Sequence, residues 1–227
     1  MPTLLLIRHA QASFGGADYD VLSARGHSQI DALHRSLTRR GIVPARVVTG
    51  SLRRQRDTGR QWAEQAGSSA RVDARWNEYD ADQVLSHHSS TQARLRARAD
   101  DTVPALSSRE FQVVLDHALE QWIDAGSQSR CALTWPQFLG QSRQALDDLG
   151  DGLRSGQSAI AFTSSGVIAA LAASLIGSPE RVFIPLNRVS VNTAITKVIV
   201  GRAGKTLLSY NDHSHLEELG EGLVTYR

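Results

Sequence analysis

The sequence predicts an α/β protein: a three-layer α/β/α sandwich with a mostly parallel central sheet and a helical insertion. Three observations support this prediction. Short apolar runs alternate with segments of helical periodicity, the middle of the chain is helical throughout, and the last two apolar runs are separated by a short loop. Alternating strands and helices are typical of open sheets whose strands are buried on both faces.

Five segments have the composition of strands, because they are apolar and are bounded by turn residues. We expect these strands at residues 3–7, 46–49, 158–163, 193–200 and 205–210. The loop between the last two contains Gly201 and Gly204. Such a short glycine-containing connection predicts an antiparallel hairpin.

Helices are expected between these strands. Ser23 is a suitable N-cap for the first helix, and Gly41 is expected to end it. A second helix follows the strand at 46–49 and ends before Gly67, and a third occupies residues 167–176 and ends at Gly177. These helices would supply the two outer layers of the sandwich.

The middle of the chain contains two capping-box patterns, Ser107-x-x-Glu110 and Thr134-x-x-Gln137, each followed by an apolar stripe with helical spacing. They predict a helical cap insertion at about residues 80–155 within a single domain that spans residues 1–227. Trp122 lies on the first of these stripes, where packing is the more common role of an aromatic side chain.

Composition limits the classes of partner. The chain has 227 residues, of which 41% are hydrophobic and 21% charged, and a net charge of +2. This charge gives no reason to expect nucleic acid as a partner. Cys131 is the single cysteine, so no intrachain disulfide can form. No apolar run approaches the ~20 residues of a membrane span, so we expect a cytoplasmic protein without membrane contact. A homodimer is compatible with the sequence.

Polar groups follow three of the predicted strands. Arg8 and His9 end the first, and an arginine and an uncharged imidazole together suit phosphate chemistry. Arg54 lies in the first turn of the helix after the second strand, where a bound anion would be favourable. Ser164, Ser165 and Gly166 form a polar turn after a later strand. For each segment a solvated strand end or helix face is the alternative interpretation.

Glu78 lies between two aromatic residues, Trp76 and Tyr79. A carboxyl group in such surroundings can have a raised pKa and act as a general acid. A surface glutamate is the alternative.

These elements together resemble the histidine phosphatase superfamily, also called the phosphoglycerate-mutase-like superfamily, over nearly the whole chain. The motif Arg8-His9-Ala10 matches the family's signature on the first strand, and residues 51–58 match a second motif when aligned on Thr58. Residues 18–26, Glu78 and the tail 211–216 are similar to further family elements. The residues Gln11 to Gly15 resemble a bacterial branch of the family.

The resemblance implies a metal-independent phosphatase without a cofactor. His9 would attack phosphorus and form a phosphohistidine, and Glu78 would first protonate the leaving oxygen and then activate water. Arg8, Arg54 and Ser164 would bind the phosphoryl group, and Gln11 and Ser13 are further candidate substrate-binding residues. The expected partner is a small phosphorylated substrate or a phosphoprotein. A phosphoglycerate mutase is less expected, because the longer signature of that class is not visible.

One departure from the family pattern concerns Ser164, which stands where the family usually has a second active-site histidine. Because serine brings no positive charge, we expect a reduced rate. A phosphate-ester-binding pseudo-enzyme is therefore an alternative function. His213 and His215 in the tail are expected to be solvent-exposed loop residues rather than replacements for the missing ring.

The pair His87-His88, close to Asp80 and Asp82, is the only other group that suggests a ligand site. Adjacent histidines lack the i, i+4 spacing of a helical metal site. We therefore interpret them as loop residues.

Overall fold

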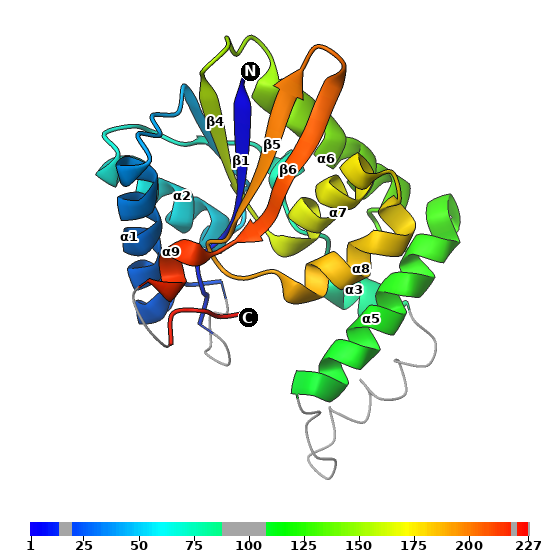
Figure 1. The fold of residues 1–227 in the computed structure, drawn as a ribbon. Coiled ribbons are helices and arrows are strands. Elements are labelled where there is room, and N and C mark those ends of the chain that lie inside the picture. The colour runs from blue at the N-terminus through cyan, green and yellow to red at the C-terminus, as the bar shows by residue number, and fades with distance from the viewer. Residues whose placement is uncertain (14–19, 88–107, 219–221, 227) are drawn as a thin grey trace. The chain divides into compact units, whose positions relative to one another are not determined.

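A computed structural model describes residues 1–13, 20–87, 108–218 and 222–226 (Figure 1). The chain divides into two compact units. The first unit combines Met1–Glu78 with Ser142–Arg227, and the second is Tyr79–Gln141. Among the described residues no helix is both long enough and apolar enough to cross a lipid bilayer.

The first unit is built on a six-stranded sheet in the order β3-β2-β4-β1-β5-β6. The described strands are β1 (Thr3–Arg8), β2 (Arg46–Thr49), β3 (Arg71–Val72), β4 (Ser158–Thr163), β5 (Ile195–Gly201) and β6 (Gly204–Asp212). The first four run parallel to one another, and β5 and β6 form an antiparallel hairpin next to β1. This arrangement confirms the predicted mostly parallel sheet and its hairpin.

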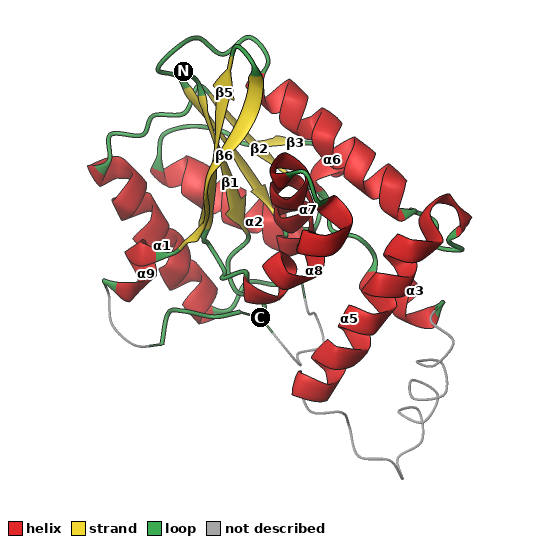
Figure 2. Cartoon of the chain, turned by 45° about the vertical axis from the view of Figure 1, so that its right-hand side comes forward, coloured by secondary structure: helices red, strands yellow, loops and turns green. Residues whose placement is uncertain are grey.

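Helices cover both faces of this sheet (Figures 1 and 2). The helices α1 (Ala24–Arg39) and α2 (Arg53–Gln65) lie on one face, and α7 (Ser165–Ile176) and α8 (Pro179–Val189) lie on the other. The short α9 (Ser214–Glu217) packs against α1. The three-layer architecture is therefore the one that the sequence predicts.

The core follows from the alternation of side chains along β1. Leu5 and Ile7 are buried in the cluster formed with α1 and α2, which includes Leu33, Trp62 and Phe162. The neighbouring β1 residues are also buried, because helices cover both faces of the sheet. This burial explains why β1 reads as a continuous apolar run.

The capping residues predicted for the start of α1 and the end of α7 are confirmed. The Ser23 side chain accepts a hydrogen bond from the Gly26 amide at 3.0 Å and caps α1. Gly177 ends α7 with a φ of 88°, a conformation that favours glycine. Gly59 of α2 is required for a different reason, because a Cβ there would lie 2.2 Å from Cγ2 of Thr49.

The second unit is helical. It contains α3 (Ala81–Ser86), α5 (Ser108–Ala125) and the first part of α6 (Trp135–Gly150). Gln137 accepts a hydrogen bond from the Thr134 amide at 2.9 Å, as a capping box requires. Ser107, in the other predicted capping box, lies outside the described residues.

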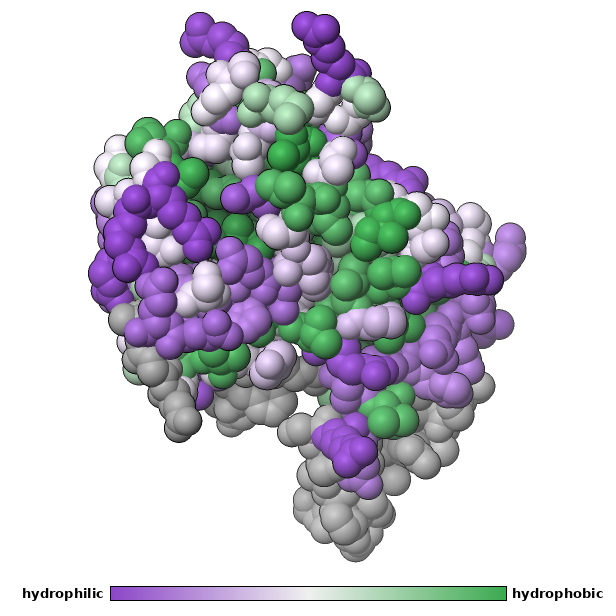
Figure 3. Space-filling model, in the orientation of Figure 1, coloured by the Kyte–Doolittle hydropathy of each residue, from purple (hydrophilic) through white to green (hydrophobic). Residues whose placement is uncertain are grey.

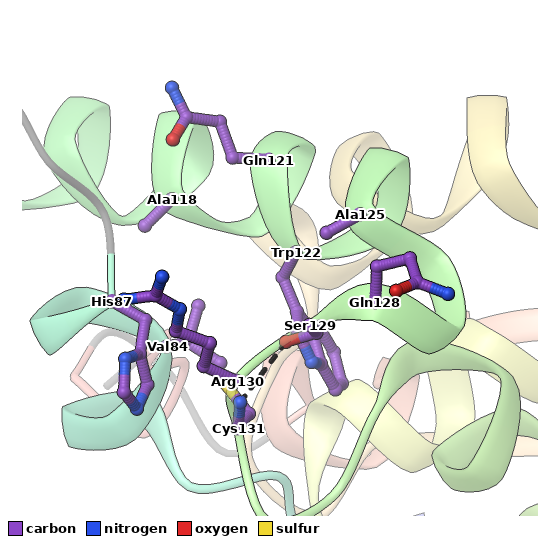
Figure 4. Close-up of a pocket in the computed structure, with 10 residues that line it drawn as sticks. All are labelled: Val84, His87, Ala118, Gln121, Trp122, Ala125, Gln128, Ser129, Arg130 and Cys131. Carbon is purple, nitrogen blue, oxygen red and sulfur yellow. Dashed lines mark hydrogen bonds between the residues drawn. The ribbon is translucent and has the colours of Figure 1, made fainter.

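Two surface features accompany this fold. Apolar side chains gather over β6, α7 and α8 (Figure 3), where Leu208, Ile176 and Val189 are among the exposed apolar residues. Within the second unit, a cavity of about 210 Å³ lies between α3, α5 and the segment after α5 (Figure 4). Its lining consists of Val84, His87, Ala118, Gln121, Trp122, Ala125, Gln128, Ser129, Arg130 and Cys131.

Candidate active site

The parallel pairing of β1, β4 and β2 brings three strand ends to one edge of the sheet. Arg8 pairs with Thr163, and Thr49 pairs with Phe162. The His9 amide continues the ladder by donating to the Thr163 carbonyl at 2.8 Å. His9 and Ser164 therefore follow neighbouring parallel strands at the same edge, which is where open α/β sheets bind ligands.

His9 is buried, and both of its ring nitrogens have partners. Nε of Arg54 donates to Nε2 of His9 at 3.1 Å, and Nδ1 of His9 lies 2.8 Å from the Ala10 carbonyl oxygen. Because an arginine nitrogen can only donate, Nε2 carries the lone pair and Nδ1 carries the proton. Burial, and then the charges of Arg54 and Arg8, hold the pKa of His9 well below its ordinary value. The ring is thus neutral, with its lone pair on Nε2.

Arg54 is held in the first turn of α2 by an ion pair. Its Nη1 lies 2.5 Å from Oδ1 of Asp20, and Oδ2 of Asp20 accepts from the Arg53 amide at 2.6 Å. Thr58 connects the same turn to the end of β1, because its hydroxyl donates to the Arg54 carbonyl at 2.7 Å and accepts from the Ala10 amide at 3.0 Å. Asp20 belongs to the family-like pattern at residues 18–26, but the sequence does not reveal its pairing with Arg54, which lies 34 residues away.

Arg8 is buried, and its Nη1 is fully used by the protein. This nitrogen donates to the Ser190 carbonyl at 2.5 Å and to the Tyr226 carbonyl at 2.7 Å. A guanidinium Nη1 has two hydrogens, so both are committed to main-chain oxygens. Arg8 can therefore face a phosphoryl group only through its other nitrogens.

Ser164 is 1% exposed, and Gln55 of α2 lies beside it. Nε2 of Gln55 donates to the Ser164 hydroxyl at 2.8 Å and to the Trp76 carbonyl at 3.0 Å. The Ser164 hydroxyl accepts in this contact and keeps its own hydrogen for another acceptor. A Cβ at position 50 would lie 1.9 Å from Oε1 of Gln55, so Gly50 makes room for this side chain.

Glu78 is half-buried at the N-terminal end of α7. Its Oε2 accepts from the Gly166 amide at 3.0 Å and lies 3.5 Å from the Ser165 hydroxyl. These contacts orient the carboxylate at the turn that follows β4. The aromatic neighbours Trp76 and Tyr79 are themselves buried.

The two candidate substrate-binding residues after β1 are bonded to the start of α1 and to the chain before it. Oε1 of Gln11 accepts from the Ser23 hydroxyl at 3.0 Å, and the Ser13 amide donates to the Val21 carbonyl at 2.7 Å. Residues 14–19, which include part of the family-like pattern at 18–26, lie outside the described residues.

The expectation that both tail histidines are exposed is wrong for His215. Its side chain is 2% exposed, and its Nε2 lies 3.2 Å from the Thr193 hydroxyl. Burial lowers its pKa to about 4. His213 is half-buried, with Nδ1 2.7 Å from the Asn211 carbonyl oxygen. The helix α9 causes the difference, because it packs against α1 and encloses one of the two rings.

The family model for the histidine phosphatase superfamily (branch 1) matches residues 4–213. No curated protein sequence gives a significant match.

Solved structures share the fold at low identity. A mycobacterial glucosyl-3-phosphoglycerate phosphatase, in complex with VO3, has a TM-score of 0.63 at 19% identity, covering 92% of this chain and 99% of its own. A histidine-to-alanine variant of phosphoserine phosphatase from Entamoeba histolytica, in complex with phosphoserine, has a TM-score of 0.66 at 15% identity, covering 95% and 100%. The α-ribazole phosphatase from Shigella flexneri has a TM-score of 0.63 at 17% identity, covering 92% and 96%. These likenesses confirm the fold that the resemblance implies.

Proposed function

Since the chain belongs to the histidine phosphatase superfamily, we propose that it is a metal-independent phosphomonoester hydrolase that acts through a phosphohistidine on His9. The observation that best supports this proposal is the neutral His9 ring. Its proton is fixed on Nδ1 by the Ala10 carbonyl, and its Nε2 lone pair meets Arg54 at 3.1 Å.

The reaction has two steps. The Nε2 lone pair of His9 attacks phosphorus, the bond between phosphorus and the ester oxygen breaks, and the leaving oxygen takes a proton from Glu78. In the second step Glu78 accepts a proton from water, the hydroxide oxygen attacks phosphorus, and the P–N bond breaks. Inorganic phosphate and neutral His9 are the products. The Ala10 carbonyl keeps the proton on Nδ1 through both steps.

Positive charge at the site is supplied by arginine, so the proposal needs no metal. Arg54 would transfer its Nε hydrogen bond from His9 to a phosphoryl oxygen, which releases the lone pair for attack. Ser164 would donate its free hydroxyl hydrogen to another phosphoryl oxygen. Because a hydroxyl brings no charge, turnover is proposed to be slower than in an active site built around a histidine at this position.

The proposed substrate is a small phosphorylated molecule. The solved neighbours are named for the small phosphomonoesters on which they act, among them phosphoserine and glucosyl-3-phosphoglycerate. A phosphoprotein is the second substrate class, and a panel that holds both phosphorylated metabolites and phosphopeptides separates the two.

The nucleophile is tested by trapping the intermediate. The protein is incubated briefly with a phosphoryl donor and quenched in alkali, because phosphohistidine is labile in acid. We expect the mass increment of one phosphoryl group on the peptide that contains His9, and none in His9→Ala. A label on a peptide without His9 would overturn the proposal.

Measurement of turnover distinguishes an active hydrolase from the pseudo-enzyme alternative. An active hydrolase releases inorganic phosphate from an aryl phosphate over many cycles, and His9→Ala releases none. Binding of inorganic phosphate without turnover of any member of the panel would favour the binding module.

A further inference from the structure

The segment 222–226 returns to the edge of the sheet at which His9 lies. Figures 1 and 2 show this end of the chain near the carboxyl end of β1. The Thr225 carbonyl accepts from the Asn192 amide at 2.9 Å, and the Tyr226 carbonyl accepts from Nη1 of Arg8 at 2.7 Å. The segment thus contacts Arg8, one of the residues proposed to bind the phosphoryl group.

The Thr225 hydroxyl is the centre of a buried hydrogen-bond network. It accepts from Nε2 of Gln29 at 2.8 Å and donates to Oδ1 of Asn192 at 2.9 Å. Nδ2 of Asn192 in turn donates to the His9 carbonyl at 2.9 Å. Gln29 is 0% exposed, Asn192 1% and Thr225 8%, so these groups are shielded from bulk solvent.

The orientation of each amide is fixed by its main-chain partner. The His9 carbonyl can only accept, so the nitrogen of Asn192 faces it and the oxygen of Asn192 faces Thr225. Oε1 of Gln29 accepts from the Gln11 amide at 2.9 Å, and therefore its nitrogen faces Thr225. The single hydroxyl hydrogen of Thr225 has one place to go, which is Asn192. A fully satisfied buried network of this kind fixes the groups that it joins.

We propose that Thr225 is a positioning residue of the active site, which holds the His9 main chain through Asn192 and holds the Tyr226 carbonyl against Arg8. The inference rests on the proposed function of His9. The inference gives segment 222–226 a part in catalysis. The Thr225 hydroxyl would set the direction of the His9 ring through Asn192, and it would also set which edge of Arg8 faces the phosphoryl group.

The test replaces Thr225 by valine, which keeps the shape and the burial of the side chain but removes the hydroxyl. The loss of one or two buried hydrogen bonds predicts that kcat on p-nitrophenyl phosphate falls about three- to tenfold. The rate of phosphohistidine formation in a single turnover should fall equally. Thr225→Ser, which restores the hydroxyl, should recover both rates. Thr206→Val, at an exposed threonine of β6, is the matched control.

A second variant keeps the test decisive if Thr225→Val folds poorly. Asn192→Ala breaks the same connection from the other side, so it should lower kcat to a similar extent, and the double variant should be no slower than the slower single variant. Wild-type kcat in Thr225→Val, or equal losses in the valine and serine variants, would overturn the inference.

The same experiment distinguishes this inference from the proposed function. If the wild-type protein forms no phosphohistidine, the proposed function fails. The network can then still be measured by nitrogen NMR, as a shift of the His9 ring signals in Thr225→Val and not in Thr225→Ser. An active wild-type protein with an equally active Thr225→Val variant overturns the inference alone.

Discussion

At the scale of single residues, the contact between Arg54 and His9 decides the state of the site. A guanidinium that donates to Nε2 cannot coexist with a protonated ring, because two donors would then face each other. Burial acts in the same direction, and the pKa of His9 is held well below its ordinary value. The ring is therefore neutral at neutral pH, which the proposed attack on phosphorus requires.

The position of Arg54 depends on Asp20, and this gives the first prediction. In Asp20→Asn the charged partner at 2.5 Å is lost, and Arg54 is no longer held between Asp20 and His9. A hydrogen bond to a charged group contributes about 1.5–3 kcal/mol. We expect kcat/KM on an aryl phosphate to fall about tenfold or more.

Asp57→Asn is the control for this prediction. Asp57 forms ion pairs with Arg53 and Arg60 on the same helix, and neither pair includes Arg54. Steady-state kinetics should show a loss for Asp20→Asn and none for Asp57→Asn. Equal kinetics for Asp20→Asn and the wild type would show that Arg54 needs no ion pair to act.

Some residues of the candidate site can be nominated from the sequence, whereas the contacts of others appear only in the structure. Arg8, His9, Arg54 and Glu78 lie in motifs whose letters are contiguous or regularly spaced, so a single sequence suffices to nominate them. Asp20, Gln55, Asn192 and Thr225 act through contacts between distant segments, and the sequence contains no periodicity that reports such contacts. Only the fold brings them to His9.

At the scale of elements, the turn from β4 into α7 places the Ser164 hydroxyl beside Gln55 of α2. Ser164→Ala removes the hydroxyl hydrogen that we propose to reach the phosphoryl group. Gln55 keeps the Trp76 carbonyl as an acceptor, so the fold should be little affected. We expect kcat to fall about tenfold, which is less than the 10²–10³ of a strong oxyanion donor. Ser174→Ala, further along α7, is the kinetic control.

A histidine placed at position 164 is expected to impair the protein. Position 164 is 1% exposed, and Gln55, which is 0% exposed, lies within hydrogen-bond distance of Ser164. An imidazole there must displace Gln55, and overpacking of this kind costs about 1–3 kcal/mol. Ser164→His should therefore lower both the melting temperature and kcat. A rise in kcat would show instead that serine alone limits the rate.

Helix α9 makes stability depend on pH through His215. Burial lowers the pKa of this ring to about 4, and the charge of Asp212 only partly opposes the shift. The unfolded chain, with an ordinary value of about 6.5, takes up the proton first. Stability therefore decreases as the pH falls from about 6.5 to about 4, by about 3 kcal/mol for this group.

His215→Gln tests this linkage, because glutamine stays neutral throughout the range. The free energy of unfolding in urea is measured for both proteins at pH 7 and at pH 4.5. The wild type should lose more stability than the variant between the two values. Equal losses of stability in the two proteins would mean that folding does not lower the pKa of His215.

Most of the elements that the sequence did not predict are short. Strand β3 has two residues, both exposed, and so gives no buried pattern. Helix α9 has four residues, and α3 has six. Helix α8 begins at Pro179, immediately after a Gly-Ser pair that reads as the end of a structured segment. Residues at 3–7, 46–49 and 158–163 were found because helices bury both faces of these strands.

At the scale of the whole molecule, strand order gives the site its place. In the order β3-β2-β4-β1-β5-β6 the three strands that precede Gly50, Ser164 and His9 are consecutive. A single sequence predicts that their ends share an edge, because parallel strands in one sheet point the same way. It does not predict the order, which depends on how separate segments pack.

The division into two units gives the last prediction. The proposed nucleophile and its arginines lie in the first unit, whereas the aromatic cluster of Tyr79, Trp122, Trp135 and Phe138 lies in the second. Phe138 is 0% exposed, and its ring centroid lies 5.7 Å from that of Trp122 and 5.8 Å from that of Tyr79. Phe138→Ala should cost about 3–5 kcal/mol in packing.

Because this loss falls in the second unit, unfolding of Phe138→Ala in urea should begin with the fluorescence change of Trp122 and Trp135. Variants with Trp62 and Trp76 replaced by phenylalanine isolate that signal. Phosphohistidine formation from a small donor should persist at low urea, since His9, Arg54 and Asp20 belong to the first unit. Phe138→Leu, which keeps most of the buried volume, should unfold in one step. Loss of labelling together with the first fluorescence change would show that the chemistry of the first unit requires the folded second unit.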